Sequence, residues 1–422
     1  MEPDQLSKLE QSLSAEYAAL ASQGLQLDIT RGKPCTDQVA LADPLDGILQ
    51  GNYTDRDGVD VRNYGGLTGL KETRELFASV LGSDPANTLI GGNGSLTLMY
   101  QVMDFAYHRG FRNSPWNQRG TPRFICPVPG YDRHFAICEH LGIDMVSVPM
   151  TGNGPDMDQV EALVKQDPDI VGMWCVPRFS NPTGEVYDEQ TVQRIAALGN
   201  IAAEGFLVMW DNAYAVHALN ADAAQLSDIN RFCDELGTQE SVFQFGSTSK
   251  VTFAGAGIAF AASGPDNLAE FCDHLGFLTI GPDKVNQLRH VKFLGDLEGI
   301  HQHMQKHAAL LRPRFEAVLD TLEKELGGAG MGTWTRPGGG YFVSFDALPG
   351  LAREIVAMAA EIGVKLTPAG ATWPYGQDPE DSNIRLAPTF AGLEDVKRAM
   401  QAFVVCVKLA CVRQANSKNA SE

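Results

Sequence analysis

The sequence lacks any long apolar run: no stretch of 18 consecutive apolar residues occurs, and the first ten residues carry four charges. A membrane-spanning helix needs such a run and a secretory signal needs a shorter apolar core, so we predict neither. The eight cysteines form no Cys-x-x-Cys pair and have no histidine at metal-ligand spacing. We therefore expect no disulfide framework and no metal site, and we expect a cytoplasmic protein.

Basic residues are also scarce, with 33 Lys and Arg against 52 Asp and Glu and a formal net charge of −19. This charge repels phosphate backbones and anionic lipid headgroups, so nucleic acid and membranes are poor candidates as partners. An anionic small molecule would have to be bound by a few local cations or by backbone N–H groups.

The residues that are present are typical of a globular enzyme with more than one core. The chain has 422 residues, 44% of them hydrophobic, and no internal repeat. Apolar strand-like runs alternate with amphipathic helices, which predicts an α/β fold with a mostly parallel sheet, followed by a smaller α+β region. Strands are predicted at residues 123–128, 169–176, 205–211, 241–246, 338–346 and 383–388. Helices are predicted within 283–326 and near 349–362 and 393–411, and the last ten residues are expected to be frayed.

Lys250 is the single charged residue between positions 241 and 260. Burial of this lysine would disfavour its ammonium form and make a neutral amine available, as imine formation with an aldehyde cofactor requires. A lysine on a solvent-facing loop is the plain alternative. Ser247-Thr-Ser-Lys250 also matches the Ser-x-x-Lys signature of β-lactamases, but the partner motifs Ser-Asp-Asn and Lys-Thr-Gly do not occur.

Three further motifs follow predicted strands or open a predicted helix. Asp211 ends a strand and Tyr214 follows it, Asn181 precedes a proline, and the glycine-rich segment 91–95 opens a helix with apolar residues at positions 96, 99, 100 and 103. A carboxylate could protonate a pyridine nitrogen, and a helix start could bind a phosphate. Each motif alone equally fits a turn or a helix cap.

Read together with Arg385, these motifs resemble the fold-type I pyridoxal-phosphate (PLP) aminotransferases of the aspartate aminotransferase superfamily, over about residues 28–410. The segments Arg31-Gly-Lys-Pro34, Tyr64-Gly-Gly-Leu-Thr-Gly69 and residues 247–257 are similar to the divergent branch called subgroup Ic. The fold that the resemblance implies is fold type I, with PLP as the cofactor.

The resemblance implies a role for each matching residue. Lys250 would form the Schiff base and move the proton between Cα of the amino acid and C4′ of the cofactor. Asp211 would keep the pyridine nitrogen protonated, while Tyr214 and Asn181 would hydrogen-bond the 3′-oxygen. These assignments make Lys250, Asp211 and Tyr214 the expected catalytic residues.

The same resemblance implies how the rest of the cofactor and the substrate are bound. Ala213 and Tyr131 would lie on the two faces of the ring, and the phosphate would be held by Gly94, Ser95, Leu96 and Ser247. Tyr64 would reach the phosphate of a neighbouring subunit, which implies a homodimer with shared active sites. The substrate α-carboxylate would be bound by Arg385, with Gly32 and Asn181 beside it.

The sequence departs from the superfamily pattern at position 258. A basic residue usually clamps the phosphate there, but this chain has Ile258. Another cation, such as Lys284 or Arg289, could replace it, or N–H groups and hydroxyls could bind the phosphate without one.

We expect a large domain over residues 48–300 and a small domain formed by 1–47 and 301–422. The expected reaction is ping-pong transamination from L-aspartate to 2-oxoglutarate, and Arg31, Lys33, Arg178 and Lys284 are candidates for binding the second substrate carboxylate. Transfer from other amino acids, a PLP-dependent lyase reaction and a non-catalytic ligand-sensing protein remain alternatives. A sensor of that kind carries a DNA-binding segment in front, and about 25 residues without a basic helix-turn-helix pattern precede the matching region.

Overall fold

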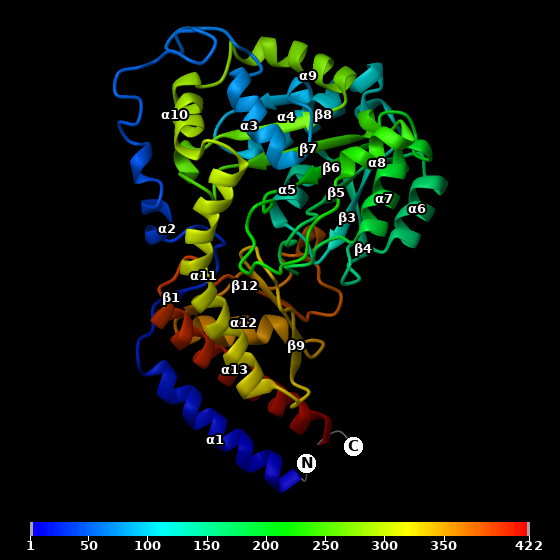
Figure 1. Cartoon of the computed structure of the whole chain (residues 1–422). Coiled ribbons are helices and arrows are strands. Elements are labelled where there is room, and N and C mark those ends of the chain that lie inside the picture. Colours follow the sequence, from blue (N-terminus) through cyan, green and yellow to red (C-terminus); the bar gives the residue numbers. More distant parts are fainter. Residues whose placement is uncertain (1–2, 420–422) are drawn as a thin grey trace.

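The computed structural model describes residues 3–419 and contains two bodies of sheet and helix (Figure 1). The larger body is built on a seven-stranded sheet in the order β2-β8-β7-β6-β5-β3-β4. All neighbouring pairs are parallel except the two that β8 makes, with β2 and with β7. The strands are β2 Thr88–Ile90, β3 Arg123–Val128, β4 Asp144–Pro149, β5 Ile170–Cys175, β6 Leu207–Asp211, β7 Val242–Ser247 and β8 Ala259–Ser263. The predicted α/β fold with a mostly parallel sheet is confirmed.

Helices cover both faces of this sheet, because its central strands are apolar on both sides. Phe124 and Cys126 of β3 pack in one cluster, against α4, α5 and α9, whereas Ile125 between them packs in a second cluster, against α6, α7 and α8. This alternation is the two-residue period of a strand. The helices of the larger body are α3 Lys71–Leu81, α4 Ser95–His108, α5 Asp132–Leu141, α6 Met157–Gln166, α7 Glu189–Ala197, α8 Ile229–Leu236, α9 Pro265–Leu278 and α10 Lys284–Leu294.

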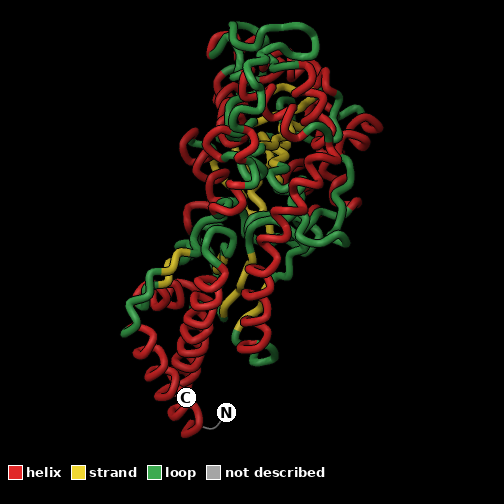
Figure 2. The backbone as a smooth tube through the Cα atoms, turned by 60° about the vertical axis from the view of Figure 1, so that its left-hand side comes forward, coloured by secondary structure: helices red, strands yellow, loops and turns green. Residues whose placement is uncertain are grey.

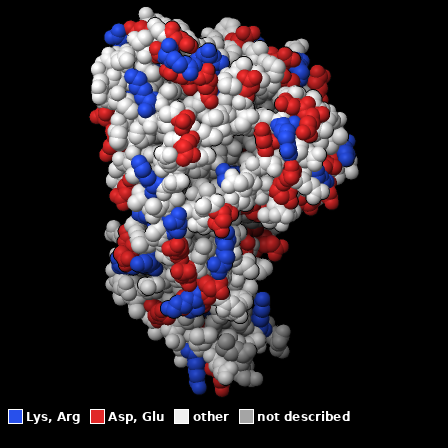
Figure 3. Space-filling view, viewed as in Figure 1, with Lys and Arg blue, Asp and Glu red and all other residues white. Residues whose placement is uncertain are grey.

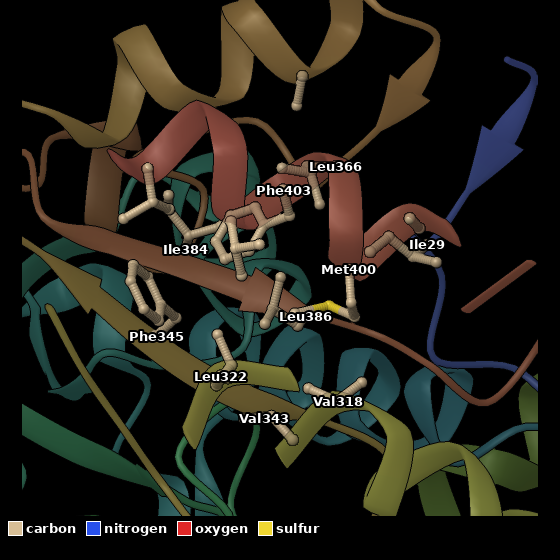
Figure 4. Close-up of a cluster of buried hydrophobic side chains, with 14 of the residues drawn as sticks. Ile29, Val318, Leu322, Val343, Phe345, Leu366, Ile384, Leu386, Met400 and Phe403 are labelled. Carbon is tan, nitrogen blue, oxygen red and sulfur yellow. The ribbon is translucent and has the colours of Figure 1, made fainter. Parts of the chain in front are cut away.

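The smaller body combines the N-terminal segment with the C-terminal part of the chain. Its antiparallel sheet has the order β12-β10-β9, and β1 pairs in parallel with β11. Figure 4 shows its core, where Met400 and Phe403 of α13 lie with Phe345 of β10 and Ile384 of β12. The elements are α1 Pro3–Ala21, β1 Leu27–Asp28, α2 Thr36–Ala40, α11 Leu297–Leu326, β9 Gly332–Trp334, β10 Val343–Ala347, α12 Ala352–Glu361, β11 Val364–Lys365, β12 Asn383–Leu386 and α13 Leu393–Asn419.

Short 3-10 helices interrupt the loops of both bodies. They span Asp43–Leu45, Pro85–Asn87, Phe111–Asn113, Trp116–Gln118, Leu198–Asn200, Gln239–Ser241, Ala254–Ala256 and Pro374–Gly376.

The helix α11 belongs to both bodies. Ile300 and Met304 near its start pack with Phe77 and Val251 of the larger body, whereas its residues from Leu311 onward pack in the smaller one. The predicted domain boundary between residues 300 and 301 falls inside this helix and stays a prediction.

Two expectations from the sequence are wrong. The strand predicted from residue 338 begins only at Val343, because Gly339 and Gly340 form a loop against the Phe179 ring, which a Cβ at Gly339 would approach to 2.4 Å. The frayed C-terminus predicted for the last ten residues is wrong up to Asn419, because α13 continues to that residue and Asn416 donates a hydrogen bond to Glu10 of α1; residues 420–422 lie outside the described residues. In Figure 2 these two helices lie side by side at one end of the molecule.

Charge is spread over the surface. On the face in Figure 3, acidic and basic side chains are interleaved over both bodies. Among residues 3–419, no helix combines the length and the apolar character that a membrane span needs.

Candidate active site

A cavity lies where the carboxyl ends of β5, β6 and β7 meet the smaller body, the usual place for ligands in an open α/β sheet. Most of its walls come from the loops after these strands and from the start of α4, and the smaller body adds Gly32 and Phe342. The lining residues are Gly32, Ser95, Leu96, Met99, Tyr131, Val176, Asn181, Asp211, Ala213, Tyr214, Lys250 and Phe342.

Lys250 brings a primary amine into this cavity, three residues after the end of β7. Its Nζ lies 5.0 Å from the centre of the Tyr214 ring and 5.9 Å from that of Tyr341. Burial lowers the pKa of Lys250, and the negative charge of Asp211 offsets part of that effect. A lowered pKa increases the share of neutral amine, the nucleophilic form.

Asp211 is buried at the end of β6, with one carboxylate oxygen paired and the other not. Its Oδ2 lies 3.0 Å from His134 Nε2, and the His134 ring stacks on Trp174 with the ring centres 4.0 Å apart. Its Oδ1 is buried and has no hydrogen-bond partner among the described residues. A buried unpaired carboxylate oxygen is costly, so this atom suits a ligand that donates a proton, as a pyridinium N–H does.

The phenols of the site are held in their neutral form. Burial is the main cause that raises the pKa of Tyr131 to about 12, and burial also raises the pKa of Tyr214 well above its usual value. Neutral phenols can donate hydrogen bonds to an anionic oxygen. Ala213 lies in the same wall between Asp211 and Tyr214.

Polar, uncharged groups lie at and beside Ser95 and Leu96 of the cavity wall. Gly94 caps the N-terminus of α4, and a Cβ built there would meet no atom within 4 Å. Ser95 and Leu96 form the first turn of this helix, whose N–H groups have no partner within the helix. Ser247 Oγ lies 3.1 Å from Ser249 Oγ, and Ser249 Oγ lies 3.1 Å from Asn93 O. Open space beside free N–H groups suits a phosphate.

Ile258 does not line this cavity, and neither do Lys284 and Arg289, the two cations suggested to replace a basic residue at position 258. Ile258 is buried, and its N–H donates to Thr248 Oγ1 at 2.8 Å. Lys284 Nζ donates to Tyr64 O at 3.3 Å, and Arg289 Nε donates to Leu45 O at 3.0 Å. Tyr64 itself is 84% exposed and does not line the cavity.

Arg385 of β12 is buried and held from several sides. Its Nη1 donates to Asp132 Oδ1 at 3.0 Å and to Asn181 Oδ1 at 3.2 Å, and its guanidinium lies 4.9 Å from the centre of the Phe342 ring. Gly32 fits against the same ring, since a Cβ there would come within 2.2 Å of it. Gly32, Asn181 and Arg385 are therefore brought together.

The four cations suggested for a second carboxylate differ in their surroundings. Arg178 donates to the main-chain oxygens of Ala215 and Ala224, so its guanidinium is held by the loop after β6. Lys33 Nζ lies 3.8 Å from the centre of the Phe390 ring. Arg31 is exposed and directly precedes Gly32 in the cavity wall.

Several residues of the site were not predicted from the sequence. Asp132 and His134 contact Arg385 and Asp211, and both lie in the first turn of α5, directly after Tyr131. Their position beside a residue already singled out could have indicated them. Trp174 and Phe342 carry no such signal, since each is an apolar residue in or beside a buried strand.

Comparison with known proteins agrees with this geometry. A family model described as aspartate amino-transferase matches residues 1–419. The chain is 43% identical over 410 residues to an aspartate aminotransferase of Corynebacterium glutamicum, a match that covers 96% of this chain and 94% of that protein. The crystal structure of an aspartate transaminase from Corynebacterium glutamicum superposes with a TM-score of 0.95 at 42% identity and covers 98% of each chain.

A more distant structure shares only the fold. It is the α-aminoadipate aminotransferase of Thermus thermophilus, with a TM-score of 0.75 at 22% identity over 94% of this chain and 95% of that one. On the family match and the close relatives, this chain belongs to the aspartate aminotransferase family, with the fold type I architecture of PLP-dependent transaminases.

Proposed function

We propose that this protein transfers the amino group of L-aspartate to 2-oxoglutarate, giving oxaloacetate and L-glutamate, with PLP bound at Lys250. The observation that carries the proposal is one cavity that holds the Lys250 amine, whose pKa is lowered, and the buried unpaired Oδ1 of Asp211. The relatives named aspartate aminotransferase support the choice of substrate.

When bound, PLP supplies an aldehyde that reacts with amines and a pyridinium ring that withdraws electrons from the substrate Cα. Asp211 Oδ1 accepts the N–H of that ring, and His134 fixes the carboxylate through Oδ2. Tyr214 and Asn181 donate to the oxygen on the ring, and the Lys250 amine takes the proton from Cα and returns it during the reaction.

The remaining contacts orient the cofactor. Tyr131 and Ala213 would hold the ring, and the first N–H groups of α4 at Gly94, Ser95 and Leu96 would bind the phosphate together with Ser247 Oγ. The hydroxyls of Ser247 and Ser249 and the first N–H groups of α4 support this arrangement, and the one basic residue among the lining residues is Lys250. Phosphate binding without a cation at position 258 follows from this set.

Arg385 binds the substrate α-carboxylate, with Asn181 beside it and Gly32 leaving room for it. Arg31 is the cation that we assign to the second carboxylate of aspartate. Arg31 directly precedes Gly32 of the cavity wall, and within residues 3–419 its side chain binds no carbonyl oxygen and contacts no aromatic ring. By contrast, Arg178 is bound to two main-chain oxygens.

We also propose a homodimer in which Tyr64 reaches the partner's site. Tyr64 is exposed beside an exposed apolar segment that includes Phe277, Leu278 and Ile280. A Cβ at Gly281 would lie 2.9 Å from Gly65 O, so this segment adjoins the Tyr64 loop. A contiguous exposed apolar surface of this kind marks an association site. Within each subunit we propose the division into residues 48–300 and the rest.

The visible spectrum of the full chain with added PLP tests the proposal. We expect a band near about 360 to 430 nm that bleaches with L-aspartate and returns with 2-oxoglutarate, and we expect no such response in Lys250→Ala. Lys165→Ala, an exposed lysine on α6, is the matched control and should behave as the unmodified protein.

A band that does not change with aspartate but changes with another amino acid would support the cofactor site and contradict the assignment of aspartate as the substrate. Release of ammonia and pyruvate in place of a new amino acid would mark a lyase. Absence of a band in the unmodified protein would overturn the proposal as a whole.

A further inference from the structure

The main chain that carries Lys250 is held by side chains that the proposed chemistry does not use. The carbonyl oxygen of Lys250 lies 3.3 Å from His217 Nε2 and 3.4 Å from the Tyr341 hydroxyl. The carbonyl oxygen of Val251 lies 2.7 Å from His303 Nε2. Two consecutive carbonyl groups are therefore bound by side chains from three separate parts of the chain.

A second layer links these contacts to the N-terminal segment. His307 lies one turn after His303 on α11, its ring meets the His303 ring edge to face with the centres 4.8 Å apart, and its Nε2 lies 3.1 Å from His303 Nε2. Gln38 of α2 donates to His307 Nδ1 at 3.1 Å and to the Tyr341 hydroxyl at 3.0 Å. Its own Oε1 accepts the Cys35 N–H at 3.1 Å, so every polar atom of the Gln38 amide is used.

The hydrogen-bond pattern assigns the protons of the two α11 histidines. A carbonyl oxygen can only accept, so His303 Nε2 carries a proton towards Val251 O. Because the Gln38 amide donates to His307 Nδ1, the single proton of a neutral His307 is on Nε2. His303 therefore donates to Val251 O, and His307 supports the His303 ring from one side and is held by Gln38 from the other. Burial lowers the pKa of His307 to about 4, which agrees with this assignment.

Burying these polar side chains costs free energy that apolar side chains would not cost. Gln38, His307 and Tyr341 are each 1% exposed or less, and apolar side chains could fill the same volume without a need for matched partners. Paired polar groups fix the geometry of what they bind, and the Gln38 amide is fully paired, although His217 Nδ1 is buried without a hydrogen-bond partner among the described residues. Here the paired groups bind the two residues from which the reactive amine extends.

We propose that Gln38, His303 and His307 are positioning residues for Lys250: they fix its main chain and so the orientation of its amine in the cavity. The inference rests on the proposed role of Lys250 in binding the cofactor. It assigns to α2 and α11, elements outside the cavity wall, a part in the reactivity of the lysine.

Amide hydrogen exchange of the full chain, with and without PLP, tests the first half of the proposal. We expect residues 248–253 to exchange about tenfold faster in His307→Leu and Gln38→Met, because the loop then opens locally. His307→Gln should restore slow exchange, since its amide oxygen can accept from the Gln38 amide as His307 Nδ1 does. His301→Leu, an exposed histidine on the same helix, is the matched control and should leave exchange unchanged.

The pH midpoint of the visible band tests the second half. We expect a shift of about 0.5 pH units or more in His307→Leu and Gln38→Met and none in His301→Leu, because a displaced amine changes the environment of its bond to the cofactor. A merely structural role would lower the melting temperature of the variants but leave this midpoint in place, and that result would overturn the proposal.

Unchanged loop exchange in a folded His307→Leu would also overturn it, and if that variant fails to fold, Gln38→Met decides both measurements. If the unmodified protein gives no visible band, the proposed function fails. Exchange then reports on the loop alone, and the claim about amine orientation falls with the proposed function.

Discussion

At the scale of single residues, the site depends on two buried polar groups, a carboxylate that is only partly hydrogen-bonded and an amine. Asp211 has one oxygen bound to His134 and one without a partner among the described residues, and Lys250 has an amine whose ammonium form is disfavoured by burial. Water would hydrate the unpaired oxygen and would favour the ammonium form of the lysine. Perturbed groups of this kind in a cavity are typical of reactive sites.

We expect Asp211→Asn to lower the rate of aspartate transamination by at least about 100-fold, because the amide cannot hold the ring N–H as a carboxylate does. The pKa of the Lys250 amine in the full chain should fall as well, since the Asp211 charge raises it. Steady-state kinetics and the pH dependence of lysine labelling measure the two effects. Asp222→Asn, at an exposed position, should change neither.

We expect Arg385→Lys to raise KM for both the amino acid and the oxo acid by about 10- to 100-fold, because an ammonium cannot present a planar fork to a carboxylate. Initial rates with each substrate measure this. Arg398→Lys on the exposed side of α13 is the control. An unchanged KM for both substrates would remove Arg385 from the carboxylate site.

At the scale of elements, the active site depends on how the N-terminal segment packs against the loop before β10. Gly32 leaves room for the Phe342 ring, and the Arg385 guanidinium lies 4.9 Å from the centre of the same ring. A change at Gly32 therefore acts on Arg385 through an aromatic ring.

Gly32→Ala should raise KM for both substrates by about tenfold, because the new Cβ would lie 2.2 Å from the Phe342 ring and must displace it. Gly276→Ala, where a Cβ meets no atom within 4 Å, is the control for adding a methyl group. If Gly32→Ala keeps the original KM values, the ring does not support Arg385 in the way described.

The same elements show what the sequence could predict. The strand predicted at 123–128 was found at Arg123–Val128, because continuous apolar runs between turn residues indicate buried parallel strands. The glycine run at 338–340 also precedes an apolar run, but its conformation is set by contact with Phe179, far away in the sequence. The end of α13 depends likewise on Glu10 of α1.

Prediction of the site from the sequence was limited in the same way, by contacts between segments that lie far apart along the chain. Motifs in order along the chain indicated the cavity residues, including Asn181 and Asp211, and the structure brings these together. The partners His134 and Asp132 and the network of Gln38 and His307 depend on contacts between distant segments, which spacing alone does not reveal.

At the scale of the whole molecule, buried neutral histidines make stability depend on pH. Burial lowers the pKa of His217 to about 3 and the pKa values of His290 and His307 to about 4, from 6.5 in an exposed histidine. Below pH 6.5 the unfolded chain binds protons that the folded chain does not. The free energy of unfolding therefore falls as the pH falls from 6.5 towards 4.

We expect each such histidine to contribute a loss of up to about 1.4 kcal/mol per pH unit in this window. Urea unfolding at a series of pH values from 7 to 4.5 measures the total. His290→Gln should show a shallower fall than the unmodified protein, because one titrating group is gone. Equal slopes in the two proteins would contradict this account.

The helix α11 has a consequence for cooperativity. Because one continuous helix of 30 residues lies in the cores of both bodies, neither core can lose its packing without exposing part of the helix that the other core needs. The free energies of the two bodies are therefore coupled, although chains with more than one core often unfold in separate steps. We expect calorimetry to record a single unfolding transition, and two resolved transitions would mean that α11 breaks before either body melts.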